Sequence, residues 1–229
     1  MELVNLPDKI LFNILNIADN VLLSLLKLTY NKKINNIIKI IQKEKFIQNK
    51  QNNYEYLNYA IENKYLNLLI YFHENNYKIK KWISYDVASN GYFDYLKYLH
   101  KNNYPCDVWT CSNASYYGHL DCLKFLHENG CPWNETTCSN ASKKGNLECL
   151  KYAHENGCPW DKKTFREAME NGNYDCLIYA HENGCPIDTW ATYGISETNK
   201  RIKCFEYLEK ITGFSYINPP KFLKTYYGF

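Results

Sequence analysis

The sequence predicts an all-α solenoid of short helix-turn-helix repeats, and two observations lead to this fold class. First, the string HENGCPW at residues 127–133 recurs unchanged at 154–160, and its first six letters return at 181–186, so each copy begins 27 residues after the one before. Second, histidine, glycine, alanine and proline each recur with the same spacing through the middle of the chain. A fixed period of this kind is typical of stacked repeat architectures.

About six repeats can be laid out at this period, at residues 54–80, 81–107, 108–134, 135–161, 162–188 and 189–215. The last repeat is shifted by one residue, since Glu209 stands near the place of the expected histidine. We expect an N-terminal helical module at 1–50, repeats at 51–215, and a tail at 216–229 that folds back as a cap. A single helical hairpin cannot bury its own apolar face, whereas a stack of hairpins forms a continuous core.

Each repeat predicts two helices joined by a glycine turn. Asn134 follows a proline by two residues and suits the N-cap, where its side chain accepts from free amides of the first turn. The first helix is expected at 135–144, and Gly145 provides the turn because glycine adopts a positive φ at little cost. The second helix is expected at 147–155 and ends before Gly157. Asp107, Asp161 and Asp188 hold the N-cap position in other repeats.

The segment ASKKGNLECLKYAHENGC, at residues 141–158, resembles an ankyrin repeat. The shared features are an alanine, a Gly-x-Leu-Glu-x-Leu core and a closing glycine, and Gly118-His119-Leu120-Asp121 is closer still. The units are shorter than the ankyrin unit of about 33 residues, and the missing residues belong to the projecting β-finger, which we expect to be shortened or absent. The pattern resembles the short repeats encoded by giant DNA viruses of the mimivirus type. The resemblance implies a protein-binding module.

The N-terminal segment at residues 3–40 resembles an F-box, with a Leu-Pro-Asp start followed by apolar residues at helical spacing. In F-box proteins this region docks on a Skp-type adaptor of a cullin ubiquitin ligase. The resemblance implies an adaptor role for a host ligase, with six contact residues: Leu6, Pro7, Ile10, Leu11, Ile14 and Leu15. The alternative is a helical cap that only covers the open end of the stack, in a structural or scaffolding repeat protein.

Cysteine and histidine recur as Cys-x4-His-x3-Cys, for example at Cys122, His127 and Cys131. Residues five apart on a helix point about 140° from one another, so this pair is poorly placed to hold a zinc ion, which needs four converging ligands. We expect these residues to pack at the seams between repeats, with each histidine bonded to a backbone carbonyl of its neighbour. Several equivalent copies also argue against a unique active site, so we expect no enzymatic activity, no metal and no cofactor.

Five tryptophans lie at the corner between the loop and the first helix. Trp82, Trp109 and Trp190 share one register, and Trp133 and Trp160 share a second, one residue after proline. Exposed aromatic residues anchor protein interfaces, so these five are candidate partner-binding residues. The alternative, which we favour, is that each ring covers the proline and helix end of the neighbouring repeat.

The composition sets limits on partners and location. A net charge of +3, with lysines interspersed among glutamates, predicts a solvated surface and no nucleic-acid partner. No apolar run is long enough to span a membrane and no signal peptide opens the chain, so we expect a soluble monomer in the cytoplasm, which is the host cytoplasm for a viral protein. The identity of the protein target is not encoded in these patterns.

Overall fold

The computed structural model describes residues 79–188 and 201–213, together with single positions scattered between 58 and 73. The chain divides into two compact units, at residues 1–83 and 84–229. In the first unit, Ile61 and Leu69 are buried, and Lys80 Nζ donates to Asn58 Oδ1 at 2.9 Å. The repeats described below belong to the second unit.

The described part of the chain is helical, and it contains no strand. This confirms the predicted all-α solenoid, and the helices expected at 135–144 and 147–155 begin and end at the predicted residues. The helices are α6 (Ile83–Ser89), α7 (Phe93–Lys101), α8 (Val108–Tyr116), α9 (Leu120–Glu128), α10 (Glu135–Lys144), α11 (Leu147–Glu155), α12 (Lys162–Asn171), α13 (Tyr174–Glu182) and α14 (Ile202–Thr212).

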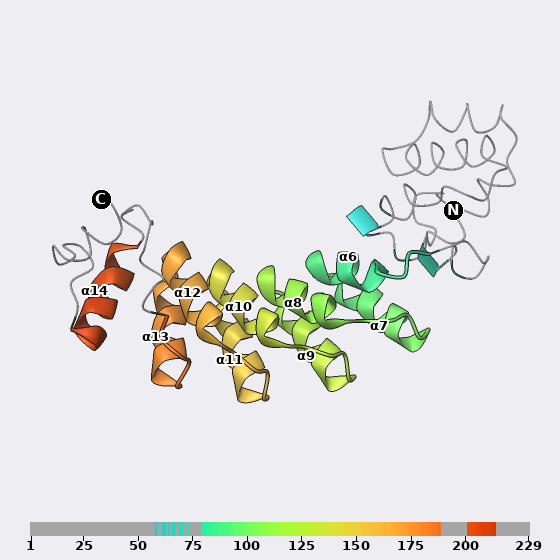
Figure 1. Ribbon diagram of the computed structural model, residues 1–229. Helices are drawn as coiled ribbons and strands as arrows, with labels where there is room; N and C mark the ends of the chain where they lie inside the picture. The colour runs from blue at the N-terminus through green and yellow to red at the C-terminus, as the bar shows by residue number, and fades with distance from the viewer. Residues whose placement is uncertain are drawn as a thin grey trace, which may run out of the picture. The chain divides into compact units, whose positions relative to one another are not determined.

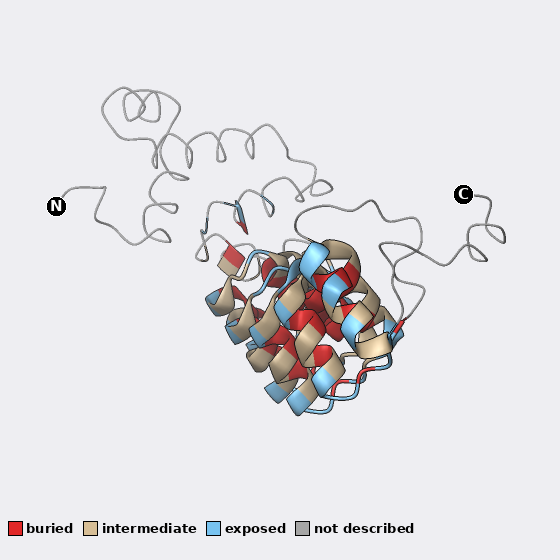
Figure 2. Ribbon diagram, turned by 90° about the vertical axis from the view of Figure 1, so that its left-hand side faces the viewer, coloured by how far each residue is buried: buried red, intermediate tan, exposed pale blue. Residues whose placement is uncertain are grey.

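The helices of the second unit form two layers (Figure 1). The first helix of each repeat lies in one layer, where α10 packs between α8 and α12. The second helices lie in the other layer, where α7, α9, α11, α13 and α14 pack in chain order. Buried residues gather between the layers (Figure 2). They include Ala114 and Ala141 from the first helices and Leu123 and Leu150 from the second helices, each with no exposed surface. Small residues on one layer let the other approach closely.

The N-caps of the first helices are formed as the sequence predicts. Asp107 Oδ1 accepts from Thr110 N at 3.0 Å, and Thr110 Oγ1 accepts in return from Asp107 N at 3.2 Å. Asp161 Oδ1 accepts from Lys163 N at 2.9 Å. These bonds satisfy amides that have no partner within the helix. Asp188 accepts from Arg166 Nη1 at 3.3 Å, and its capping role stays a prediction because the residues that follow it lie outside the described part.

A ladder of hydrogen bonds joins successive repeats at the glycine turns. Asn146 Nδ2 donates to the carbonyl oxygens of Ser115 and Tyr116, at 2.9 and 2.8 Å. These carbonyls end α8 and have no partner within it. A Cβ atom on Gly118 would lie 2.9 Å from Asn146 Oδ1, and Gly118 has a φ of +78°. Glycine is therefore required here both for its backbone conformation and for the close approach of the next repeat.

The same ladder recurs one repeat further along. Asn173 Nδ2 donates to the carbonyl oxygens of Ser142 and Lys143, at 2.7 and 2.9 Å. One repeat before Asn146, His119 stands at the asparagine position, and its Nε2 atom lies 3.1 Å from the Ser89 carbonyl oxygen. The repeated Gly-Asn pair is therefore the contact that sets the spacing between repeats.

The last helix confirms the expected one-residue shift. Cys204, Phe205 and Leu208 of α14 are buried, as are the residues 28 positions earlier on α13. Tyr207 of α14 also contacts His181 of α13. The extra residue is accommodated before α14, so α14 still packs on α13 in the register of the repeat.

Candidate protein-binding surface

A row of stacked rings runs along the layer of second helices. The His127 and Trp133 rings have centroids 3.9 Å apart and planes 11° apart. His154 and Trp160 stack in the same way, at 3.6 Å and 14°. Tyr152, from the next repeat, lies edge-on to Trp133 with centroids 6.2 Å apart. Both tryptophans are thus partly buried in contacts within and between repeats, and their role in binding a partner stays a prediction.

The histidines of this row bond to tyrosine hydroxyls. His127 Nδ1 lies 3.0 Å from Tyr152 Oη, and His181 Nδ1 lies 2.8 Å from Tyr207 Oη. The expectation of a backbone-carbonyl partner was therefore wrong for these two histidines. Carbonyls in the helix interior already accept bonds within their own helix, whereas the tyrosine of the next repeat reaches across the gap. Burial raises the pKa of Tyr152 and that of Tyr207 above the ordinary value.

The other tryptophan register is exposed. Trp109 lies in the first turn of α8 with 56% of its surface accessible, and Trp82, in the first unit, is 64% accessible. Thr136 and Lys163 hold this register in the next two repeats. Exposed aromatic rings are candidates for protein contacts, since their burial is strongly favourable.

Trp109 belongs to a patch that we call the α8 face, made of Trp109, Asn113, Tyr116 and Tyr117, with Lys144 of α10 beside it. Trp109, Asn113 and Tyr116 are spaced at i, i+4 and i+7, so they share one side of the helix. The Tyr116 and Tyr117 rings meet edge to face at 4.9 Å, and Lys144 Nζ lies 4.7 Å from the Tyr116 ring centroid. Tyr117 is 54% accessible.

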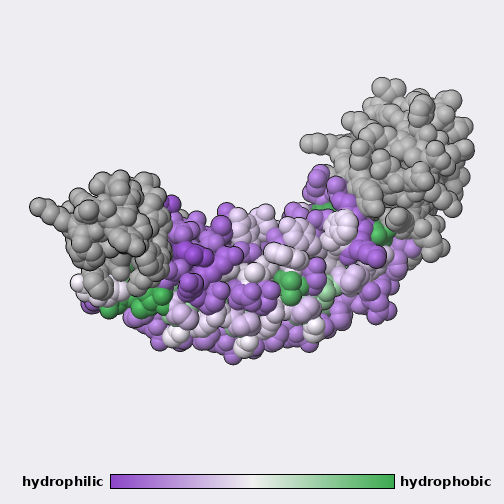
Figure 3. Space-filling view, in the orientation of Figure 1, coloured by the Kyte–Doolittle hydropathy of each residue, from purple (hydrophilic) through white to green (hydrophobic). Residues whose placement is uncertain are grey.

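The rest of the described surface is more hydrophilic than the α8 face. In the view of Figure 3 the described residues are mostly hydrophilic, with apolar residues in separate places. On the first-helix layer beyond α8, charged side chains replace aromatic ones, and Lys143 pairs with Glu167 at 3.3 Å. The α8 face therefore gathers aromatic rings, a residue class that is enriched in protein interfaces.

Several predicted site residues lie outside the described part of the chain. Trp190 is one of them. The proposed adaptor contacts are the others: Leu6, Pro7, Ile10, Leu11, Ile14 and Leu15. Their roles stay predictions.

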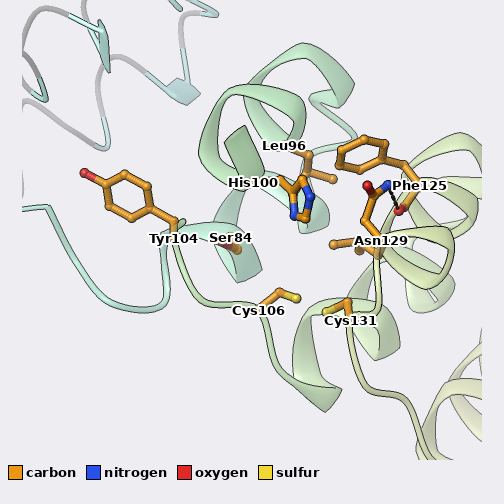
Figure 4. Close-up of a pocket in the computed structure, with 9 residues that line it drawn as sticks. Ser84, Leu96, His100, Tyr104, Cys106, Phe125, Asn129 and Cys131 are labelled. Carbon is orange, nitrogen blue, oxygen red and sulfur yellow. Dashed lines mark hydrogen bonds between the residues drawn. The ribbon is translucent and has the colours of Figure 1, made fainter. Parts of the chain in front are cut away.

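A small recess lies in the second-helix layer between the first two repeats of the second unit (Figure 4). Its empty space, counted together with the open solvent at its mouth, is about 270 Å³, and its lining includes His100, Tyr104, Cys106, Phe125 and Cys131. The repeat pattern explains why the recess is open. Cys106 stands 27 residues before Trp133, where the stacking tryptophan would be. Because Cys106 has no ring to cover His100, the imidazole is exposed and the recess stays open. This recess was not predicted, although the sequence has a cysteine where the tryptophan register would place a ring.

The cysteines of the Cys-x4-His-x3-Cys pattern have separate environments. Cys122 is buried between the layers, whereas His127 stacks on Trp133 at the edge. The second cysteines close each hairpin: the Cys158 thiol donates to the Asn134 carbonyl oxygen at 3.2 Å, and the Cys185 thiol donates to that of Asp161 at 3.2 Å. Among the described residues, no group of three or more His, Cys, Asp or Glu side chains is arranged to hold a metal ion.

The paired helices, the glycine turns and the hydrogen-bond ladders between repeats can be compared with known protein families. Residues 111–154 match the family model described as ankyrin repeats (many copies). The matched stretch is therefore similar to ankyrin repeats. They indicate a protein–protein interaction module, whose two layers and seams are those described above.

A solved structure is also similar to part of this chain. The crystal structure of the human ASB11 ankyrin repeat domain is similar to this chain with a TM-score of 0.48 and 23% identity, over 56% of this chain and 68% of that one. No curated protein matches the chain. In the described residues, no helix is both long enough and apolar enough to cross a membrane.

Proposed function

We propose that the ankyrin repeats bind a protein target through the α8 face, and that residues 1–50 connect this target to a Skp-type adaptor of a cullin ubiquitin ligase. The observation that carries the first part is the exposure of Trp109 in α8 and of Tyr117 at its C-cap, on a helix whose other side is packed. The second part is supported by the Leu6-Pro7-Asp8 start and the apolar spacing after it. The activity proposed is binding without catalysis, in the cytoplasm.

The α8 face can be tested without disturbing the fold. The repeats recruit the target through the Trp109 ring, so Trp109→Ala is expected to weaken its capture by at least about tenfold, as for an aromatic residue at an interface centre. Glu148→Ala is the matched control, since Glu148 is exposed on α11 in the opposite layer. The measurement is quantitative affinity capture from cells, with helical circular dichroism to check folding. Equal capture by both variants would exclude the α8 face as the binding surface.

The adaptor role needs a separate test, because it depends on a different part of the chain. Purified Skp-type adaptor is expected to bind the full chain, and Leu6→Ala with Pro7→Ala is expected to remove that binding. Asn13→Ala is the control, because Asn13 is a polar position of the same predicted helix. If the wild-type chain does not bind the adaptor, residues 1–50 act only as a cap and the protein is a scaffolding repeat protein.

A further inference from the structure

Cys106 occupies a position that two other repeats give to a stacking tryptophan. In the repeats that contain Trp133 and Trp160, the indole ring covers the histidine six residues earlier. In the repeat that contains Cys106, the equivalent His100 is exposed and borders the recess of Figure 4. Replacement of the ring by a thiol therefore leaves a nucleophilic group in an open recess.

A second thiol lies beside it. Cys106 belongs to the loop before α8 and Cys131 to the loop after α9, so the two cysteines meet where one hairpin begins and ends. Both cysteines line the recess, and Figure 4 shows their sulfur atoms pointing toward each other. The Cys131 thiol has one hydrogen, which it can direct to the Cys106 sulfur or to the Asp107 carbonyl oxygen at 3.5 Å.

Cys106 differs from the other cysteines in exposure and acidity. Of the ten cysteines, nine are buried and Cys106 is half-buried. The hydrogen bond from Cys131 lowers the pKa of Cys106, against the smaller opposing effects of burial and of the nearby Asp107 carboxylate. Burial instead raises the pKa of Cys149 to about 11 and that of Cys176 to about 12. Since the thiolate is the reactive form, Cys106 is the thiol best placed to react.

We propose that Cys106 and Cys131 form a redox-active pair that hydroperoxides convert into a disulfide. This inference rests on the recess and the two thiols, and it does not depend on the proposed binding function.

The reaction takes two balanced steps. In the first, the Cys106 thiolate attacks one peroxide oxygen, the O–O bond breaks, and the leaving hydroxide takes a proton to become water. In the second, the Cys131 sulfur attacks the sulfur of the resulting sulfenic acid, the S–S bond forms, and the S–O bond breaks. The Cys131 proton leaves with the hydroxide as a second water. The two thiols together lose two electrons, and these reduce one hydrogen peroxide molecule to two water molecules.

The test treats the reduced full chain with equimolar hydrogen peroxide, then alkylates the remaining thiols in denaturant and maps them by mass spectrometry. Cleavage before Asp107 separates Cys106 from Cys111, and cleavage after Glu135 separates Cys131 from Cys138. The expected product joins the Cys106 and Cys131 fragments and is reversed by dithiothreitol. Cys138 and Cys158 are the internal control, since both are buried, and they are expected to stay reduced. If the folded chain shows no disulfide between Cys106 and Cys131 after peroxide treatment, the proposal is overturned.

Two variants test the separate steps. In Cys131→Ser, Cys106 is expected to accumulate as sulfenic acid that dimedone traps, and absence of the adduct would overturn the first step. Cys106→Trp restores the letter found at the equivalent position of the next two repeats, so it is expected to fold and to leave Cys131 unreactive. A peroxide-driven disulfide from Cys131 in that variant would show that Cys106 is not its partner. In the native chain, iodoacetamide is expected to modify Cys106 at least about tenfold faster than Cys131.

Discussion

The asparagine ladder between repeats makes a sharp stability prediction. Asn146→Ala removes two hydrogen bonds to the carbonyl oxygens of Ser115 and Tyr116, at 2.9 and 2.8 Å, and leaves the end of α8 without these partners. Each such bond contributes about 1 kcal/mol net, so the variant is expected to lower the free energy of unfolding by about 2 kcal/mol. Asn146 makes no side-chain capping bond to its own helix, so the loss measures the contact between repeats.

Asn156→Ala is the matched control. Its Nδ2 atom also donates to a backbone carbonyl, that of Tyr152 at 2.8 Å, but this bond lies at the exposed end of a single helix. The measurement is urea unfolding of the full chain followed by circular dichroism. With a slope of about 2 kcal/mol/M, Asn146→Ala is expected to shift the midpoint by about 1 M, and the control by less than half of that. Equal shifts for the two variants would refute the role of the ladder in holding repeats together.

Three further predictions follow from the same seams. Gly118→Ala is expected to destabilise the chain by more than 1 kcal/mol, because an alanine would be forced to a positive φ. The loss is expected to be smaller in an Asn146→Ala background, where the side chain nearest to the new Cβ atom is removed, and equal losses in a double-mutant cycle would contradict this. Trp133→Ala is expected to cost about 2 kcal/mol in urea unfolding, since the half-buried ring stacks on His127, and an unchanged midpoint would refute a structural role. Stability is expected to be intact below about pH 9, the ordinary pKa of an unfolded thiol, and to fall toward pH 11. Burial raises the pKa of Cys149 to about 11, so the folded state holds its proton longer; in Cys149→Ala the fall is expected to be smaller, and an identical pH profile would contradict the assignment.

Much of the fold could be predicted because its determinants are local. The glycine at the turn and the aspartate or asparagine at the N-cap act within a few residues, so the bounds of α10 and α11 followed from the letters themselves. The repeat period then placed each helix pair in a stack, since a lone hairpin leaves its apolar face in water.

The contacts between repeats were harder to predict. The expectation that histidines bond to backbone carbonyls failed for His127, which bonds to Tyr152 of the next repeat. A period shows which residues are equivalent, but the atom that meets a given ring depends on the offset between neighbouring hairpins. The recess at Cys106 was missed for a related reason, because a departure from the tryptophan register gains meaning only after Trp133 is seen to stack on its histidine.

The amino-acid sequence by itself determined the helices, their caps and their repetition, because backbone hydrogen bonding and burial of a helical stripe act over short stretches of chain. Only the tertiary structure decided which side chains meet across the seams, which tryptophans stay exposed and where two thiols face each other. These outcomes depend on the docking of segments 24 to 31 residues apart, as for Cys131 with Asp107 and Asn146 with Ser115. Those contacts depend on how neighbouring hairpins pack, which the local sequence patterns do not predict.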